Sequence, residues 1–424
     1  MSHVLPTARL RARHRADKRF VWYGRVALTF ALLMLALLVG MLVIRGASGF
    51  LRAEAMLPVR FDLARVDMHD AAEAARLSPL RFVRLAEDAL QAHVQGISPP
   101  PGTREMYGLL PGLAVGDALR DALLKHPEWA GGTHEVWVPV AAALDQALKR
   151  GTLDAAPSPA SALTPAQRAI GRTLAAEGRL RETWNTRFLT TGDSREPEEA
   201  GFGGAVTGSL LTVLICMAAA FPLSVMTAVY LQEFAPPGRL VDIIEVNINN
   251  LAAVPSIVYG LLGLGVYINV MGIPRSSTLV AGLTLALMAM PVIIIATRLA
   301  LGSVPDSIRQ AALALGASPL QVAWHHTLRL SLPGIMTGTI LAIARVLGET
   351  APLLLIGMVA FVADVPRGAL DPATAMPVQI FLWAASPETG FAEKTAAGIL
   401  VLLGVLLALN ACALYIRRRF EIRW

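Results

Sequence analysis

Long apolar runs set the pattern of this chain. A helix needs about 20 apolar residues to cross the hydrocarbon core of a membrane, and six runs reach or nearly reach that length. Five of them contain no Asp, Glu, Lys or Arg, and the remaining one is interrupted only by Arg345 and Glu349. Lipid offers the peptide backbone no hydrogen-bond partner, so each run is expected to be helical. The runs are 26–44, 202–232, 246–274, 276–297, 330–363 and 395–416.

Basic residues gather outside the first and last runs. Seven lie from Arg9 to Arg25, before the first run, and four lie from Arg417 to Arg423, after the last. Cytoplasmic flanks of membrane helices carry such an excess, so both termini are expected in the cytoplasm. Six spans give the even number that this orientation requires, and the 364–394 segment then lies outside.

A cleaved signal peptide is the alternative interpretation of the first run, with Ala53-Glu54-Ala55 as the cleavage site. The apolar region of a signal peptide usually has about 7–15 residues, and this run is longer. Its length favours an uncleaved anchor that spans the membrane.

The segment between the first two runs, residues 46–200, has the charge density of a soluble domain. It carries 17 basic and 20 acidic residues, whereas the rest of the chain carries 20 basic and 11 acidic residues. A strand is expected at 56–63, and a helix at 80–94 that Ser78 caps and Pro79 begins.

The second half of this segment is expected to hold a linker and a longer helix. Residues 153–164 are rich in Ala, Pro and Ser, which is typical of a linker. Thr164 then begins a helix, because Pro165 suits the first turn and Gln167 completes a capping box. This helix is expected to reach about residue 188.

Together these patterns predict an all-α polytopic membrane protein of six spans with a mixed extracytoplasmic insert between spans 1 and 2. The expected parts are a cytoplasmic basic tail at 1–25, an anchor at 26–45, the insert at 46–200, a membrane core at 201–418 and a cytoplasmic tail at 419–424. The core spans are expected at about 206–230, 247–271, 277–299, 331–357 and 396–416.

Composition excludes other classes of protein. Hydrophobic residues make up 54% and charged residues 16%, against about 25% charged residues in soluble domains. The net charge of +6 does not indicate a nucleic-acid partner, because the basic residues cluster at the ends of apolar runs. No lysine follows a glycine, so the Walker A loop is missing and ATP hydrolysis is not expected on this chain.

No metal site is expected either. Cys216 and Cys412 lie within apolar runs, which favours membrane-core residues over a disulfide or a metal centre. The four histidines of the insert are scattered, and ordinary surface residues are the favoured interpretation. They are His69, His93, His126 and His134.

The loop between the fourth and fifth spans, residues 303–329, carries the most specific pattern. A helix is expected to begin near Pro305 and to stop at Gly316, which tolerates the left-handed conformation. Ser318 and Pro319 then begin a second short helix. The expected product is a helix–glycine–helix elbow on the cytoplasmic side. Ile308, Ala311, Ala312 and Leu315 recur at helical spacing and predict one apolar stripe that could seat in a groove on another protein.

This elbow resembles the coupling loop of ABC-importer permeases, whose signature is Glu-Ala-Ala, three residues, then Gly. The chain has Gln310-Ala311-Ala312 and Gly316 at that spacing, with Gln310 in place of the usual Glu. The resemblance implies that these four residues dock into a separate ATPase subunit, which would also hold the ATP and magnesium. The plain alternative is an amphipathic loop that lies on the membrane surface.

Five further stretches resemble the PstA-type phosphate permeases in particular, in order over residues 201–424. The resemblance implies the membrane core of a type I ABC importer permease in the bacterial inner membrane. It also implies an ATPase dimer, a second similar permease subunit and an extracytoplasmic phosphate-binding protein as partners. The stretches are 228–235, 254–262, 345–352, 377–383 and 419–424.

Arg345 and Glu349 are the candidate substrate-path residues. They are four residues apart and are expected to share one helix face. Charged residues within a span are costly and persist when paired or functional. By resemblance, matching residues of phosphate permeases take part in transport, and a guanidinium can bind phosphate through two parallel hydrogen bonds. A structural ion pair is the alternative.

Gly334 and Gly338 form a Gly-x-x-x-Gly pair that admits a close helix neighbour, either another subunit or another helix of this chain.

Two other functions also fit these patterns. One is the import of another oxyanion, such as sulfate or molybdate. The other is a membrane-anchored sensor or enzyme that acts through the 46–200 domain.

Overall fold

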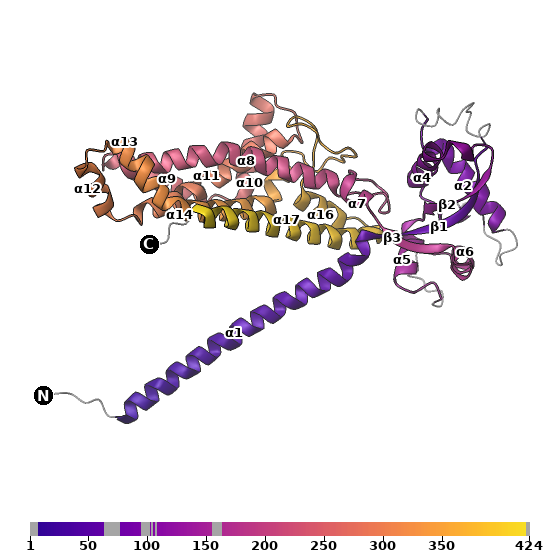
Figure 1. Ribbon diagram of the computed structural model, residues 1–424, viewed down its shortest axis with the longest axis horizontal. Coiled ribbons are helices and arrows are strands. Elements are labelled where there is room, and N and C mark those ends of the chain that lie inside the picture. The colour runs from indigo at the N-terminus through magenta and orange to yellow at the C-terminus, as the bar shows by residue number, and fades with distance from the viewer. Residues whose placement is uncertain are drawn as a thin grey trace.

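The computed structural model describes residues 7–62, 77–94, 102, 105–106, 108–154 and 163–420. Figure 1 shows a bundle of helices with a mixed insert at one end and a long first helix that diverges from the bundle. The fold is therefore the expected one, a helical membrane protein with a mixed α/β insert. His69, residues 155–162 of the expected linker and residues 421–424 of the last quoted stretch lie outside the described residues.

The first helix, α1 (Thr7–Ala47), includes both most of the expected tail and the anchor. It leads into the short η1 (Ser48–Phe50), which packs with the end of α1 on the last helix, α17 (Gly390–Phe420). A Cβ atom on Gly46 would lie 2.6 Å from the Leu400 side chain. The glycine therefore lets α1 approach α17 closely at the end of the bundle next to the insert.

The insert is built on a three-stranded antiparallel sheet with the order β2-β1-β3. Leu57 of β1 faces Val136 of β2, and Ala53 of β1 faces Glu182 of β3. Helices cover the sheet, and Leu57, Phe82 and Leu119 are among the side chains buried in their shared core. The elements are β1 (Leu51–Arg60), α2 (Leu80–His93), α4 (Gly112–Lys125), η4 (Pro127–Trp129), β2 (Thr133–Pro139), α5 (Ala142–Lys149), α6 (Pro165–Ala176), β3 (Leu180–Trp184) and α7 (Arg187–Thr190).

The capping box at the start of α6 is confirmed, because Thr164 Oγ1 accepts from Gln167 N at 3.2 Å and Gln167 Oε1 accepts from Thr164 N at 3.0 Å. Two other local predictions were wrong. Pro79, not Ser78, is the capping residue of α2, and no side chain caps that helix. The helix after Thr164 ends at Ala176 instead of reaching residue 188, because Gly178 adopts φ +69° and the chain then pairs with β1 as β3.

The bundle is arranged around α11 (Thr278–Gly302), which packs on α8 and α14. Ala281, Ala289 and Ala342 lie in the buried core, where small side chains permit close packing. The other bundle elements are α8 (Gly203–Val229), η5 (Tyr230–Phe234), α9 (Arg239–Ala252), α10 (Ser256–Leu262), η6 (Gly263–Val270), α14 (Leu328–Gly348), α15 (Ala351–Leu355) and α16 (Met376–Ala384).

The third predicted span is not one straight helix, and this expectation was wrong. α9 ends at Ala252, and α10 with η6 continues at an angle of 102° after a short break. Pro255 lies in the break, has no N–H to donate, and disfavours a helical conformation at Val254. In the described residues, five helices are long and apolar enough to cross a membrane, or six if this bent pair counts as one span.

The fifth predicted span also differs. α14 ends at Gly348, and the chain resumes as the short α15, with Pro352 in its first turn. A continuous helix would lose a backbone hydrogen bond at Pro352, which accounts for the interruption. The segment 364–394 holds α16 as well as loop.

Candidate functional site

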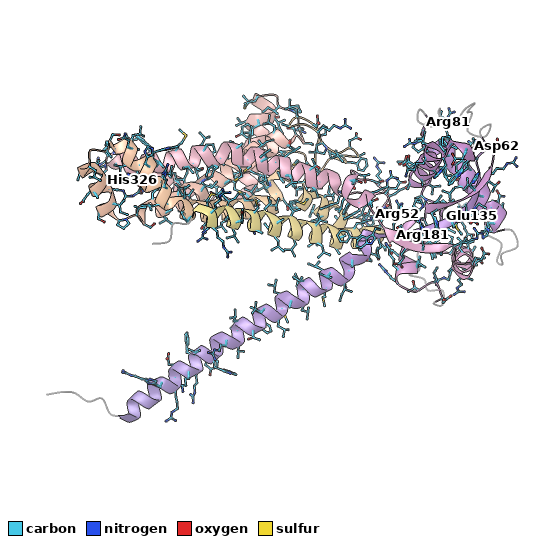
Figure 2. The ribbon with its side chains drawn as sticks, in the orientation of Figure 1. Arg52, Asp62, Arg81, Glu135, Arg181 and His326 are labelled. Atoms are coloured by element: carbon cyan, nitrogen blue, oxygen red, sulfur yellow. The ribbon has the colours of Figure 1, made fainter. Side chains whose placement is uncertain are left out.

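The elbow between α11 and α14 has the predicted shape. α12 (Asp306–Ala314) is followed by Gly316 at φ +87°, and Ser318 caps α13 (Pro319–Gln321) in a capping box with Gln321. The π-helical η7 (Val322–Thr327) then continues into α14. Figure 1 places α12 and α13 at the end of the bundle far from the insert, and Figure 2 shows His326 of η7 there. The helix–glycine–helix prediction is confirmed.

The residues of the apolar stripe predicted on α12 differ in exposure, since Ile308 is half-buried and Ala311 and Leu315 are exposed. Ala312 is buried, as are Val322 and Ala323 of η7, because α12 packs against η7 of the same chain. Gln310 and Ala311 are exposed. The elbow presents other apolar side chains outward, with exposed fractions of 48% for Leu313, 90% for Leu315, 66% for Leu320 and 62% for Trp324.

Arg309 holds the base of the elbow through a network of hydrogen bonds. Its Nε donates to Glu233 Oε2 at 3.2 Å and its Nη2 to Glu233 Oε1 at 2.9 Å. Nη1 donates to the Val304 carbonyl at 2.7 Å, and Nη2 also donates to the Leu301 carbonyl at 2.9 Å. The hydrogen bonds to Glu233 are the main cause that raises the pKa of Arg309. One guanidinium thus joins α12 to two other elements. These are η5, which continues α8, and the end of α11.

A second ion pair lies nearby, between Arg298 of α11 and Glu245 of α9, with Nη2 and Oε1 2.5 Å apart. Sequence reasoning missed both pairs. The available signal was that Glu233, Glu245 and Arg298 lie directly at the ends of apolar runs, but their partners lie far away in the sequence.

Arg345 and Glu349 lie together, as an ion pair with Nε and Oε1 3.7 Å apart. Their expected place on one helix face was wrong, because α14 ends at Gly348 and Glu349 has an extended backbone with ψ 129°. The Arg345 side chain is 43% exposed and that of Glu349 is 21% exposed. The pair therefore lies at an open interruption of the helix rather than within a packed interior.

The bend of the third span lies beside this pair. The Tyr259 hydroxyl of α10 donates to the Leu251 carbonyl of α9 at 2.7 Å, and a Cβ atom on Gly260 of α10 would lie 2.7 Å from Pro352 Cα of α15. Two of the stretches that resemble phosphate permeases, 254–262 and 345–352, thus meet in space. Their proximity was not part of the sequence prediction.

The pair Gly334 and Gly338 faces α11 of the same chain. A Cβ atom on Gly334 would lie 2.6 Å from Ala300 Cβ, and one on Gly338 would overlap Ala296. Within the described part of the chain, these glycines allow α14 to approach α11.

Two histidines of the insert gather around one tryptophan. The rings of His126 and His134 stack on Trp129, with centroids 4.4 Å and 4.8 Å away. His93 instead pairs with Glu177, with Nε2 and Oε2 2.7 Å apart. These arrangements are packing and ion-pair contacts within the insert.

Comparison with known families gives the class of the protein. Residues 220–423 match the family model described as binding-protein-dependent transport system inner membrane component. Residues 7–157 match a domain of unknown function, DUF3333, which covers α1 and most of the insert. The chain is thus a multi-pass inner-membrane component of the transport class to which ABC permeases belong.

Curated relatives narrow this class. The phosphate transport system permease protein PstA of Yersinia pestis is 36% identical over 222 residues, which cover 51% of this chain and 73% of the relative. PstA 1 of Mycobacterium tuberculosis is 34% identical over 244 residues, which cover 56% of this chain and 77% of the relative. The chain belongs to the PstA family of phosphate transport system permease proteins.

Among solved structures, the inward-facing MetNI methionine ABC transporter aligns with a TM-score of 0.40 and 17% identity, over 52% of this chain and 98% of that chain.

Proposed function

We propose that this chain is the permease subunit of an ATP-driven importer that moves inorganic phosphate across the inner membrane. The observation that carries the proposal is the elbow of α12 and α13, built at the far end of the bundle in a chain of the PstA family. The relatives are named for phosphate transport, which favours phosphate over sulfate or molybdate.

An ATPase subunit is the partner that fits the elbow. Leu313, Leu315, Leu320 and Trp324 expose apolar surface at its outer face. Exposed apolar patches commonly mark protein interfaces. ATP and magnesium would bind to this partner, since the chain has no Walker A loop. Gln310, Ala311 and Gly316 would line or shape the contact, while Ala312 supports it from inside.

A second permease subunit would complete the transport path. Leu251 of α9 and Ile257, Val258 and Leu261 of α10 are exposed around the bend, next to Arg345 and Glu349. A path between two subunits would expose Arg345 to a passing anion, and its guanidinium can donate two hydrogen bonds to phosphate. Glu349 would hold the guanidinium between passages.

The orientation follows from the basic flanks and the position of the insert. Figure 1 shows that the N-terminal end of α1, the C-terminal end of α17 and the elbow all lie away from the insert. With both termini and the elbow in the cytoplasm, the insert faces an extracytoplasmic phosphate-binding protein.

Uptake of radioactive phosphate by cells that depend on this chain tests the proposal. Gly316→Arg should abolish uptake, because the left-handed conformation favours glycine and the arginine would project at the docking surface. Excess sulfate or molybdate should leave wild-type uptake unchanged. Normal uptake by Gly316→Arg, or a purified complex without an ATPase, would reject the proposal.

A further inference from the structure

The elbow is connected by the chain itself to only two of the packed helices of the core. α11 leads into α12, and η7 leads into α14. The end of α8 is distant in sequence, because Glu233 precedes Arg309 by 76 residues. The Arg309–Glu233 ion pair connects this third helix to the elbow.

The geometry of this pair suits the transmission of movement. Two nitrogens of Arg309 contact the two oxygens of Glu233, and a forked contact of this kind restricts rotation and sliding more than a single hydrogen bond does. The Arg309 side chain is 18% exposed and that of Glu233 is 9% exposed, so solvent and salt screen the pair weakly.

Arg309 also fixes the end of α11. The carbonyls of Leu301 and Val304 lie where α11 ends, and carbonyls at a helix C-terminus lack partners within the helix and carry partial negative charge. A cation that binds these carbonyls and Glu233 at once keeps α8, α11 and α12 in one fixed arrangement.

We propose that Arg309 is a positioning residue for transport, which passes displacement of the elbow to α8 through Glu233. This inference rests on the proposed function, in which an ATPase moves the elbow. It predicts that, when the forked contact is lost, the complex still forms and hydrolyses ATP but transports less phosphate for each ATP.

The test uses the complete complex, with both permeases, the ATPases and the binding protein, reconstituted in lipid vesicles. The measured quantity is phosphate transported per ATP hydrolysed, with the amount of ATPase that copurifies as a second measurement. Arg309→Gln should lower the ratio about fivefold or more. Arg309→Lys, which keeps the charge but loses the fork, should give an intermediate ratio. The exchange Arg309→Glu with Glu233→Arg should recover part of the loss.

Asp306→Asn is the matched control. Asp306 accepts from Arg309 Nη1 at 3.0 Å, but its side chain is 84% exposed and belongs to α12 itself. Its loss should leave the ratio unchanged, because no contact between helices disappears.

Three outcomes would overturn the proposal. The first is an assembled Arg309→Gln complex with the wild-type ratio, and the second is an equal loss of transport and hydrolysis, as a purely structural role predicts. The third is a failure of both Arg309→Gln and Arg309→Lys to assemble. If the unsubstituted complex neither hydrolyses ATP nor transports phosphate, the proposed function itself fails.

Discussion

The guanidinium of Arg150, at the end of α5 in the insert, lies 3.1 Å from the carboxylate of Glu393 in the first turn of α17. Beside it, Lys149 Nζ donates to Asp145 Oδ2 at 2.6 Å and to the Leu51 carbonyl at 2.7 Å, and lies 4.0 Å from Glu393. The insert is thus joined by charge to the last helix of the bundle.

These two neighbouring cations should contribute unequally to stability. Arg150 is 55% exposed and Lys149 is 6% exposed. Arg150→Met should cost about 0.2–1 kcal/mol, the range for exposed ion pairs. Lys149→Met leaves the half-buried Asp145 carboxylate without its cation and should cost about 3–5 kcal/mol. Unfolding of the insert followed by tryptophan fluorescence measures both, and equal losses would contradict the assignment.

Glu198 predicts a pH dependence of the insert's stability. Burial raises the pKa of Glu198 from 4.5 to about 7. In the unfolded chain this carboxyl ionises near its ordinary pKa, while the folded protein keeps the proton until about pH 7. The folded state binds more protons in this window, so its stability falls as pH rises from about 4.5 to about 7, by about 3 kcal/mol at most.

The variant Glu198→Gln isolates this effect, since Gln is close in shape and cannot ionise. Its free energy of unfolding should exceed that of the wild type at pH 8 and approach it at pH 4. The comparison is made between unfolding curves of the two proteins at a series of pH values. A difference that does not change with pH would show that Glu198 is not the titrating group.

Close packing of α14 on α11 makes Gly338 sensitive to a single methyl group. The methyl group added by Gly338→Ala would overlap Ala296. The substitution should therefore destabilise the bundle by about 1–3 kcal/mol, despite the higher helix propensity of alanine. Gly265→Ala is the matched control, because nothing lies within 4 Å of its Cβ position. Thermal unfolding of the purified protein compares the two, and a Gly338→Ala variant as stable as the Gly265→Ala variant would disprove the close contact.

Removal of the Arg345 guanidinium should impair transport without preventing assembly. Arg345→Gln should lower the initial rate of phosphate uptake about tenfold, the effect of one lost charge-assisted hydrogen bond. Arg345→Lys should retain an intermediate rate, because ammonium keeps the charge but lacks the fork. Uptake assays are paired with measurement of the copurifying ATPase. Unchanged uptake by the assembled Arg345→Gln complex would leave the residue a structural role.

Local rules predicted the elbow. Ser318 and Gln321 are close in sequence and cap α13, and Gly316 needs no distant partner to adopt φ +87°. Likewise, Thr164 and Gln167 begin α6 where expected. Apart from the cap expected from Ser78, the predictions that failed concern longer segments. The third span was expected as one helix because its run contains no charged residue, although Pro255 lies at the point where it bends.

The amino-acid sequence by itself determined the apolar spans, the insert, the elbow and the resemblance to phosphate permeases, because each depends on composition or on residues a few positions apart. Only the tertiary structure decided that Arg309 binds Glu233, that α10 packs on α15, and that residues 180–184 form a strand instead of extending a helix. These outcomes depend on contacts between residues far apart in the chain. Such contacts form only when helices and strands pack, and no local pattern specifies their partners.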